Sequence, residues 1–242
     1  MIQELENIKL LLEKSARKKH TLFFKVNVGD YAQHDQFMGV SMPILRKMAK
    51  DFIKLSLENI KYLIKSPINE ERLLALLILI NQYEQGDKNE IYQFYISHLN
   101  YVNNWNLVDS SAHLIAGAYL YKKDKGILLD LAKSEIIWER RISIVSTLYF
   151  IRRGEFKLTL RIAEILLEDT HDLIHKAVGW MLREVGKRNK ELLVIFLNKY
   201  ATSMPRTMVR YAIEKLPEDE RKSYLNAKKM LVPPMTIKEK IG

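Results

Sequence analysis

Apolar residues along most of the chain recur at intervals of three and four positions, which is the spacing of one face of an α-helix. The first segment shows this spacing in Leu5, Ile8, Leu11 and Leu12. A second helix is predicted to begin at Ser41, a residue type that caps helices, with Pro43 in its first turn. No stretch alternates between apolar and polar residues for long enough to require a sheet. The pattern therefore predicts an all-α protein with no sheet.

The predicted helices follow one another through short links that carry turn residues. After the helix that begins at Ser41, they are expected at about 56–66, 69–85, 88–101, 104–122, 125–133, 136–153, 155–168, 171–187, 190–200, 204–216 and 218–228. Taken in pairs, they recur with a period of roughly 31–37 residues, which is typical of an α-solenoid. We expect a HEAT-like solenoid of roughly six to seven helix pairs, as a single domain over 1–228 with a C-terminal tail over 229–242.

Composition narrows the class of partner. The chain of 242 residues has 39 Lys and Arg against 29 Asp and Glu, a net charge of +10, which favours nucleic acid or an anionic membrane surface. The absence of Cys excludes disulfides, thiol catalysis and thiolate metal sites. The longest apolar run, Leu73 to Ile80, is far shorter than the roughly 20 residues of a membrane span, and the N-terminal segment lacks signal-peptide features. We expect a soluble cytoplasmic protein, associated with the nucleoid if the source is bacterial.

Trp105 and Asp109 are four residues apart, so they share one face of the helix predicted at about 104–122. Ala112 and Ala116 continue this face, which lies nearly opposite the apolar stripe of the same helix. A large aromatic residue beside a carboxylate, above two small residues, predicts a surface on which another molecule lies. The alternative is that Trp105 packs against a neighbouring repeat and Asp109 is an ordinary surface acid.

Arg141 points partly inward from the helix predicted at about 136–153, where a guanidinium needs a carboxylate or a phosphate as partner. The structural alternative is an ion pair with Asp109 or Glu139. Arg152 and Arg153 lie at the end of the same helix, where positive charge compensates the helix dipole.

Trp180 lies at the edge of the apolar stripe of the helix predicted at about 171–187. Gly179 precedes it in mid-helix at a cost of about 1 kcal/mol relative to Ala, which indicates close approach by another group or a helix–helix contact. His171 and His175 have a spacing compatible with a metal site, but no third ligand is evident, so we predict no metal.

Several segments together closely resemble the AlkD-type DNA alkylation repair family. They are GVSMPILRKMAK (39–50), WNLVD (105–109), WERR (138–141), HKAVGWMLREVGKR (175–188) and MPRTMVRYAIEKLP (204–217). The resemblance covers roughly residues 20–226. It implies HEAT-like repeats and a glycosylase that removes cationic N3- and N7-alkylated purines from duplex DNA.

The resemblance also implies roles for matching positions. Asp109 matches the catalytic carboxylate, Trp105 and Trp180 match two aromatic residues that flank the sugar of the lesion, and Arg141 matches an arginine near the scissile bond, with Arg140 as the neighbouring alternative. A phosphate track is expected along Lys176, Arg183, Lys187, Arg188, Arg206 and Arg210, with Arg140 as a further DNA contact.

The implied activity is that of a monofunctional DNA glycosylase of base excision repair. It would use water as the nucleophile, without strand cleavage, base flipping, metal or cofactor. The expected partner is double-stranded DNA carrying alkylated purines, with no membrane and no obligate protein partner, and the protein is expected to be a monomer. The alternatives are a non-catalytic HEAT-like module that binds DNA or RNA, and a protein scaffold.

Overall fold

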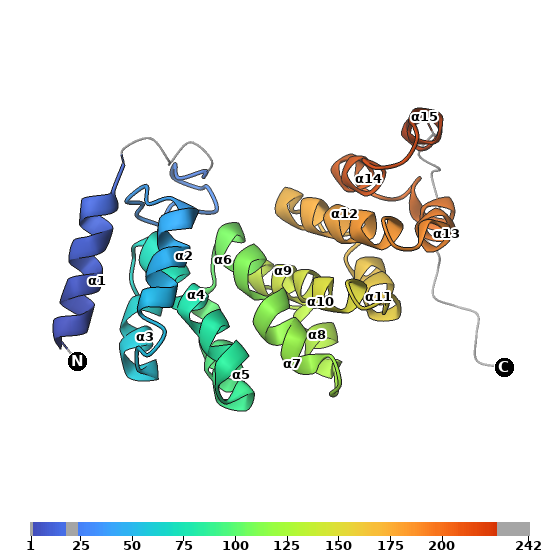
Figure 1. Ribbon diagram of the computed structural model, residues 1–242. Coiled ribbons are helices and arrows are strands. Elements are labelled where there is room, and N and C mark those ends of the chain that lie inside the picture. The colour runs from blue at the N-terminus through green and yellow to red at the C-terminus, as the bar shows by residue number, and fades with distance from the viewer. Residues whose placement is uncertain (1, 18–23, 227–242) are drawn as a thin grey trace. The chain divides into compact units, whose positions relative to one another are not determined.

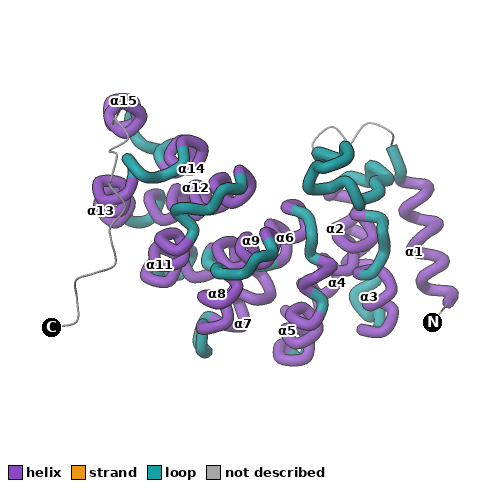
Figure 2. Tube along the Cα trace, turned by 180° about the vertical axis from the view of Figure 1, so that it is seen from behind, coloured by secondary structure: helices purple, strands orange, loops and turns teal. Residues whose placement is uncertain are grey.

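The computed structural model describes residues 2–17 and 24–226, so the predicted tail over 229–242 lies outside the described residues. The described elements are helices joined by loops, with no strand among them, as Figures 1 and 2 show; two segments meet only in an isolated bridge between Gln36 and Ile68. The predicted all-α class is confirmed. The chain divides into two compact units, Met1–Ile162 and Ala163–Gly242. Because each repeat of a solenoid contacts only its neighbours, one solenoid domain can also divide into two such units. The single domain over 1–228 therefore stays a prediction.

The first unit contains most of the helices. They are α1 (Ile2–Ser15), α2 (Met42–Asp51), α3 (Leu57–Ile64), α4 (Asn69–Gln85), α5 (Lys88–Ser97), α6 (Trp105–Ser111), α7 (Ala118–Leu120), α8 (Gly126–Leu131), α9 (Ile137–Ser146) and α10 (Leu148–Ile151). A 3₁₀ turn, η2, spans Leu99–Tyr101, and a π-helix, η3, spans His113–Gly117. Helix α11 (Lys157–Ile165) crosses the division between the units. The second unit continues with α12 (Asp172–Gly186), α13 (Lys190–Tyr200), α14 (Arg206–Ala212) and α15 (Glu218–Asn226).

Helix α4 is the centre of the first unit. It packs against α2, α3, α5 and α6 (Figure 1), and its apolar run from Leu73 to Ile80 is buried on every side. A helix that is apolar all round belongs in a protein interior, which explains why this run shows no solvent face in the sequence.

A buried carboxylate fixes where α4 and α6 begin. Asp35 accepts hydrogen bonds from the amide of Asn69 at 2.9 Å and from that of Asn104 at 2.7 Å, and it also pairs with the guanidinium of Arg72. Asn69 is the first residue of α4, and Asn104 is the residue directly before Trp105. Since a buried charge must keep its partners, the position of Trp105 is tied to the first turn of α4.

The π-helix η3 interrupts the helix that the sequence predicts over 104–122. Its characteristic bond runs from the amide of Gly117 to the carbonyl of Ala112 at 2.9 Å, one residue longer than in an α-helix. Ala112 and Ala116 are fully buried, so the prediction that they extend an exposed face is wrong. The hydroxyl of Ser146 on α9 lies 3.4 Å from the Ala112 carbonyl, which shows that this side of the helix faces α9.

In the second unit, α12 packs against α13 and α14. A Cβ added to Gly179 would lie 2.5 Å from the carbonyl oxygen of Met208 and 2.5 Å from Cβ of Tyr211, both on α14. The close approach expected at Gly179 is therefore a contact between two helices.

A substitution at Gly117 tests how closely η3 must approach α9. A Cβ at this position would lie 2.2 Å from the carbonyl oxygen of Ser146, a backbone atom that cannot rotate away. We expect Gly117→Ala to lower the free energy of unfolding by about 1–3 kcal/mol, as overpacking does, in urea denaturation. The matched control is Gly126→Ala, where Cβ would meet only the flexible side chain of Asp124. Equal effects of the two substitutions would contradict a close η3–α9 contact.

Candidate active site on helices α6 and α9

The ion pair between Asp109 on α6 and Arg141 on α9 is the central feature of the site. Nε of Arg141 donates to Oδ1 of Asp109 at 2.9 Å, and Nη2 donates to Oδ2 at 2.8 Å. The Arg141 side chain is 6% exposed and that of Asp109 is 22% exposed. A two-bond pair of this kind holds a carboxylate in one orientation while leaving its outer edge accessible. Of the partners that the sequence leaves open for Arg141, the structure shows Asp109.

Arg140 has a different set of contacts. Its Nη1 donates to the carbonyl of Ser134 at 2.9 Å and to that of Glu135 at 3.0 Å. The guanidinium therefore binds the backbone just before α9. The two neighbouring arginines thus differ in these contacts, and the choice of Arg141 as the site arginine stays a prediction.

Trp105 is the first residue of α6, one turn before Asp109, and its ring is half-buried. Its Nε1 donates to the hydroxyl of Tyr31 at 3.2 Å, and its ring stacks on Phe24 with 5.3 Å between ring centres. Phe24 in turn stacks on Phe37 at 4.3 Å. Two aromatic residues from the segment between α1 and α2 thus contact the indole, and a third supports one of them.

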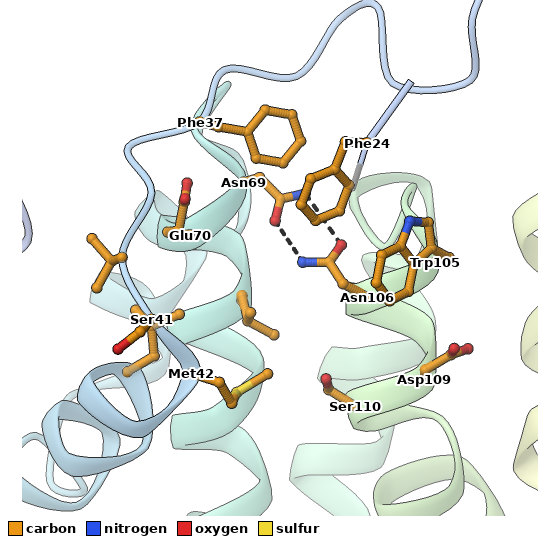
Figure 3. Close-up of a pocket in the computed structure, with 13 residues that line it drawn as sticks. Phe24, Phe37, Ser41, Met42, Asn69, Glu70, Trp105, Asn106, Asp109 and Ser110 are labelled. Atoms are coloured by element: carbon orange, nitrogen blue, oxygen red, sulfur yellow. Dashed lines mark hydrogen bonds between the residues drawn. The ribbon is translucent and has the colours of Figure 1, made fainter. Parts of the chain in front are cut away.

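Below this stack lies a cavity of about 290 Å³ between α2, α4 and α6, which we call the aromatic pocket (Figure 3). It is lined by Phe24, Phe37, Val40, Ser41, Met42, Leu45, Asn69, Glu70, Leu73, Trp105, Asn106, Asp109 and Ser110. Most of these side chains are apolar, and Glu70 binds the amides of Met38 and Gly39 at 3.0 and 2.7 Å. The amide of Asn106 donates to the side-chain oxygen of Asn69 at 2.7 Å, so these polar groups are used within the protein.

Nothing in the sequence pattern predicted that Phe24, Tyr31 and Phe37 belong to the site. They belong to an irregular segment without helical periodicity, more than sixty residues before Trp105 along the chain. Only their aromatic character marks them in the sequence, and that character does not reveal which residue they contact.

The second unit carries the other expected site residues. Trp180 lies half-buried on α12. Because Trp180 belongs to the second unit and Asp109 to the first, their proximity stays a prediction. Four of the predicted DNA-binding cations there have carboxylate partners in the same unit: Lys176 with Asp172, Arg183 with Glu214, and Lys187 and Arg188 with Glu184. Arg206 and Arg210 are exposed on α14. Binding of DNA by these residues also stays a prediction. Their ion pairs do not exclude it, because ion pairs of this kind at a surface contribute only about 0–1 kcal/mol and can be exchanged for phosphate.

His113 begins η3 and is 8% exposed. Burial, together with the positive charge of Arg152, lowers the pKa of His113 to about 4, although the polar backbone of Asp109 acts in the opposite direction. The imidazole is therefore neutral at physiological pH. A neutral histidine is consistent with a site where positive charge is already concentrated.

The histidine pair of α12 has structural contacts. Nδ1 of His171 accepts from the amide of Leu173 at 3.1 Å, and the ring of His175 bonds the carbonyl of Asp169. Among the residues that the structure describes, no group of three or more His, Cys, Asp or Glu side chains could hold a metal ion. Within the same ranges, no helix has the length and apolar character needed to cross a membrane.

The fold and the site define an all-helical repeat protein in which a half-exposed tryptophan lies one turn from a carboxylate held by an arginine. The chain belongs to the DNA alkylation repair enzyme family, whose model, described as "DNA alkylation repair enzyme", matches residues 3–216. This match includes the segments that carry the resemblance seen in the sequence, apart from Pro217 at the end of the last one, so the predicted family is confirmed.

Solved structures show the same fold. A predicted DNA alkylation repair enzyme from Enterococcus faecalis is 18% identical, with a TM-score of 0.61 over 78% of this chain and 92% of its own. AlkD2 from Streptococcus mutans is 18% identical, with a TM-score of 0.56 over 92% of this chain and 98% of its own. The protein smu.31 from Streptococcus mutans UA159 is 18% identical, with a TM-score of 0.52 over 77% and 92%. No curated protein sequence matches the chain. Membership of the family supports a role in DNA repair.

The pKa of His113 gives the stability of the protein a defined pH dependence. The native imidazole takes up its proton near pH 4, whereas the unfolded chain does so near pH 6.5. Because the native pKa is the lower one, His113 has no effect above about pH 6.5, and it reduces stability as pH falls from there towards 4. The reduction reaches roughly 3 kcal/mol.

We expect His113→Gln to lose less stability than the wild type between pH 7 and pH 4.5 in urea denaturation. The difference in slope with pH is the measurement, so any loss that the substitution causes at pH 7 does not affect it. NMR titration of the wild type should place the pKa of His113 near 4. Titration near the ordinary value of about 6.5 would contradict a buried, neutral imidazole.

Proposed function

We propose that the protein is a DNA glycosylase that excises cationic N3- and N7-alkylated purines from duplex DNA by hydrolysis of the N-glycosidic bond. The observation that carries this proposal is the carboxylate of Asp109, held by two hydrogen bonds from Arg141 and one turn from Trp105, in a member of the DNA alkylation repair family. The proposal includes action as a monomer in the cytoplasm, without a metal or cofactor, without strand cleavage and without flipping of the base.

The chemistry needs little more than a fixed negative charge. A purine alkylated at N3 or N7 is cationic, so it leaves the sugar as a neutral base and requires no general acid. The bond between C1′ and the purine nitrogen breaks, the electron pair leaves with the base, and the sugar becomes oxocarbenium-like. A water molecule then adds to C1′ and loses a proton. A carboxylate beside C1′ stabilises the positive sugar and can orient the water, as carboxylates do in glycosidases.

The guanidinium of Arg141 reduces this stabilisation without abolishing it. At an effective dielectric constant of about 20, a carboxylate at about 3.5 Å attracts a unit positive charge by about 5 kcal/mol, and a guanidinium at about 7 Å repels it by about 2 kcal/mol. The nearer charge dominates. Arg141 therefore acts as a positioning residue, since it holds Asp109 in one orientation and a carboxylate already in place needs no reorganisation during the reaction.

Trp105 supports the same chemistry. The face of an indole attracts a cation by about 0.5–2 kcal/mol, so a tryptophan near the sugar stabilises its developing positive charge. The contacts of Trp105 with Tyr31 and Phe24 fix the ring before substrate arrives. The proposal assigns Trp180 the matching place on the other side of the sugar, on the basis of the family resemblance.

The activity is tested by release of 7-methylguanine from methylated duplex DNA. We expect the wild type to release the base and Asp109→Asn to do so about 10²–10³-fold more slowly, the usual loss when a preorganised electrostatic group is removed. Thermal unfolding and binding of the same duplex serve as controls for the fold. Equal release by both proteins would remove Asp109 from the mechanism. Binding of DNA by the wild type without any release would instead favour the non-catalytic module, in which the ion pair only joins α6 to α9.

The role of Arg141 is tested by separating catalysis from binding. If Arg141 positions Asp109, Arg141→Met lowers kcat by about tenfold or more while Kd for duplex DNA and its salt dependence stay the same, and Arg141→Lys recovers part of the rate. If Arg141 instead binds a phosphate, Kd rises and the slope of log K against log salt falls by about one. The second result would contradict the positioning role.

A further inference from the structure

A second cavity, of about 490 Å³, adjoins Asp109 in the first unit. It lies between α2, α4, η3 and the end of α10, and Asp109 and Ser110 line it as well as the aromatic pocket. Its other polar lining includes Arg46, Lys50, His113 and Arg152. We call it the basic cavity.

Three cations face the basic cavity without a carboxylate partner. Arg46 and Lys50 are four residues apart on α2, so they share one face of that helix, and Arg152 directly follows α10. Within the described ranges, none of the three forms an ion pair with a carboxylate. The one carboxylate that lines the cavity, that of Asp109, is already bound by Arg141. The cavity therefore concentrates positive charge that the protein does not balance locally.

His113 provides a second, independent indication of a ligand. Among the described residues, no group lies in hydrogen-bonding geometry with its buried Nδ1, and the side chain, which is 8% exposed, lines the cavity. Buried polar atoms usually bind a protein group, a water molecule or a ligand. Burial and the repulsion from Arg152 together lower the pKa of the imidazole to about 4. The contribution of Arg152 shows that the positive potential of the cavity reaches this ring.

Most of the arginines and lysines that the sequence predicts to bind DNA already have partners, although Arg206 and Arg210 are exposed. In the second unit, Lys176, Arg183, Lys187 and Arg188 have carboxylate partners. Arg141, for which the sequence left a phosphate as a possible partner, binds Asp109. A phosphate beside Asp109 is therefore served best by the cations of the basic cavity.

We propose that the basic cavity binds a phosphate of the DNA backbone next to the nucleotide on which Asp109 acts, with Arg46, Lys50 and Arg152 supplying the charge. Ser110 offers a hydroxyl donor, and His113 offers a nitrogen that bonds a bridging water when neutral and the phosphate itself when protonated. The assignment of this phosphate to the DNA backbone beside the damaged nucleotide rests on the proposed function, whereas the binding of a phosphate rests on the cavity alone. The site thus fixes the register of the backbone relative to the carboxylate, as phosphate contacts do in protein–DNA complexes.

The experiment measures Kd for a fluorescent duplex at several NaCl concentrations with the wild type, Lys50→Gln and Arg152→Gln. The matched control is Lys47→Gln, which removes an exposed lysine from the same helix, outside the cavity lining. We expect each cavity variant to weaken binding by about five- to tenfold at low salt and to reduce the slope of log K against log salt by about 0.9, the value for one lost phosphate contact. Lys47→Gln should match the wild type. Equal losses in all three variants, or none in the cavity variants, would overturn the proposal.

A second experiment, with inorganic phosphate, distinguishes a site for free phosphate from a site for a phosphate of the DNA backbone. We expect added phosphate, compared with chloride at equal ionic strength, to shift the NMR resonances of His113 and raise its pKa, in the wild type and in Asp109→Asn alike, but not in Arg152→Gln. Binding of inorganic phosphate while duplex affinity is unaffected by the cavity variants would overturn the assignment to the DNA backbone. Neither measurement requires base release, so the two proposals can fail separately. Binding through this cavity without release of 7-methylguanine would support the phosphate site and contradict the glycosylase activity.

Discussion

The buried carboxylate of Asp35 is the constraint on which the geometry of the site depends. Its side chain is fully buried, so it must keep its bonds to Arg72, Asn69 and Asn104. Loss of one partner of such a buried pair costs about 3–5 kcal/mol, which is a large part of the stability of a typical domain. Since Asn69 starts α4 and Asn104 precedes α6, one charge sets where both helices begin. Trp105 and Asp109 take their places on α6 from that starting point.

The contact between α6 and α9 then determines what Asp109 can do. The π-turn at η3 and the absence of a side chain at Gly117 let the end of this helical segment approach the backbone of α9. At that separation Arg141 reaches Asp109 with two hydrogen bonds. A carboxylate held in this way loses rotational freedom when the protein folds rather than when substrate binds, which is the physical basis of preorganisation.

Helical periodicity predicted the fold class and nearly every helix, because most of the core is formed by stripes of apolar residues at helical spacing. It could not reveal the π-turn, nor that α9 covers the side of the helix on which Ala112 and Ala116 lie, and so these two residues looked like part of an exposed face. The resemblance of short segments indicated Asp109 and Trp105 as candidate site residues, and the inward position of Arg141 limited its partner to a few groups. The residues that hold Trp105 in place were not predictable, because Phe24, Tyr31 and Phe37 lie in a segment without periodicity. Their contacts depend on tertiary packing.

The ion pairs separate cations that already have carboxylate partners from cations that do not, a distinction that the net charge of +10 cannot show. Counting charges treats every lysine and arginine alike, and Arg152 in particular is equally well explained in the sequence as compensation of a helix dipole. In the structure, carboxylates compensate most of the cations expected to bind DNA on α12, whereas Arg46, Lys50 and Arg152 face one cavity without such compensation. A cation that already has a partner gains less from a phosphate than an uncompensated cation does, because it must first give up an ion pair, which at a surface contributes about 0–1 kcal/mol. Of these two groups, the cations that are more favourable for binding a polyanion therefore lie beside the carboxylate that is proposed to act on it.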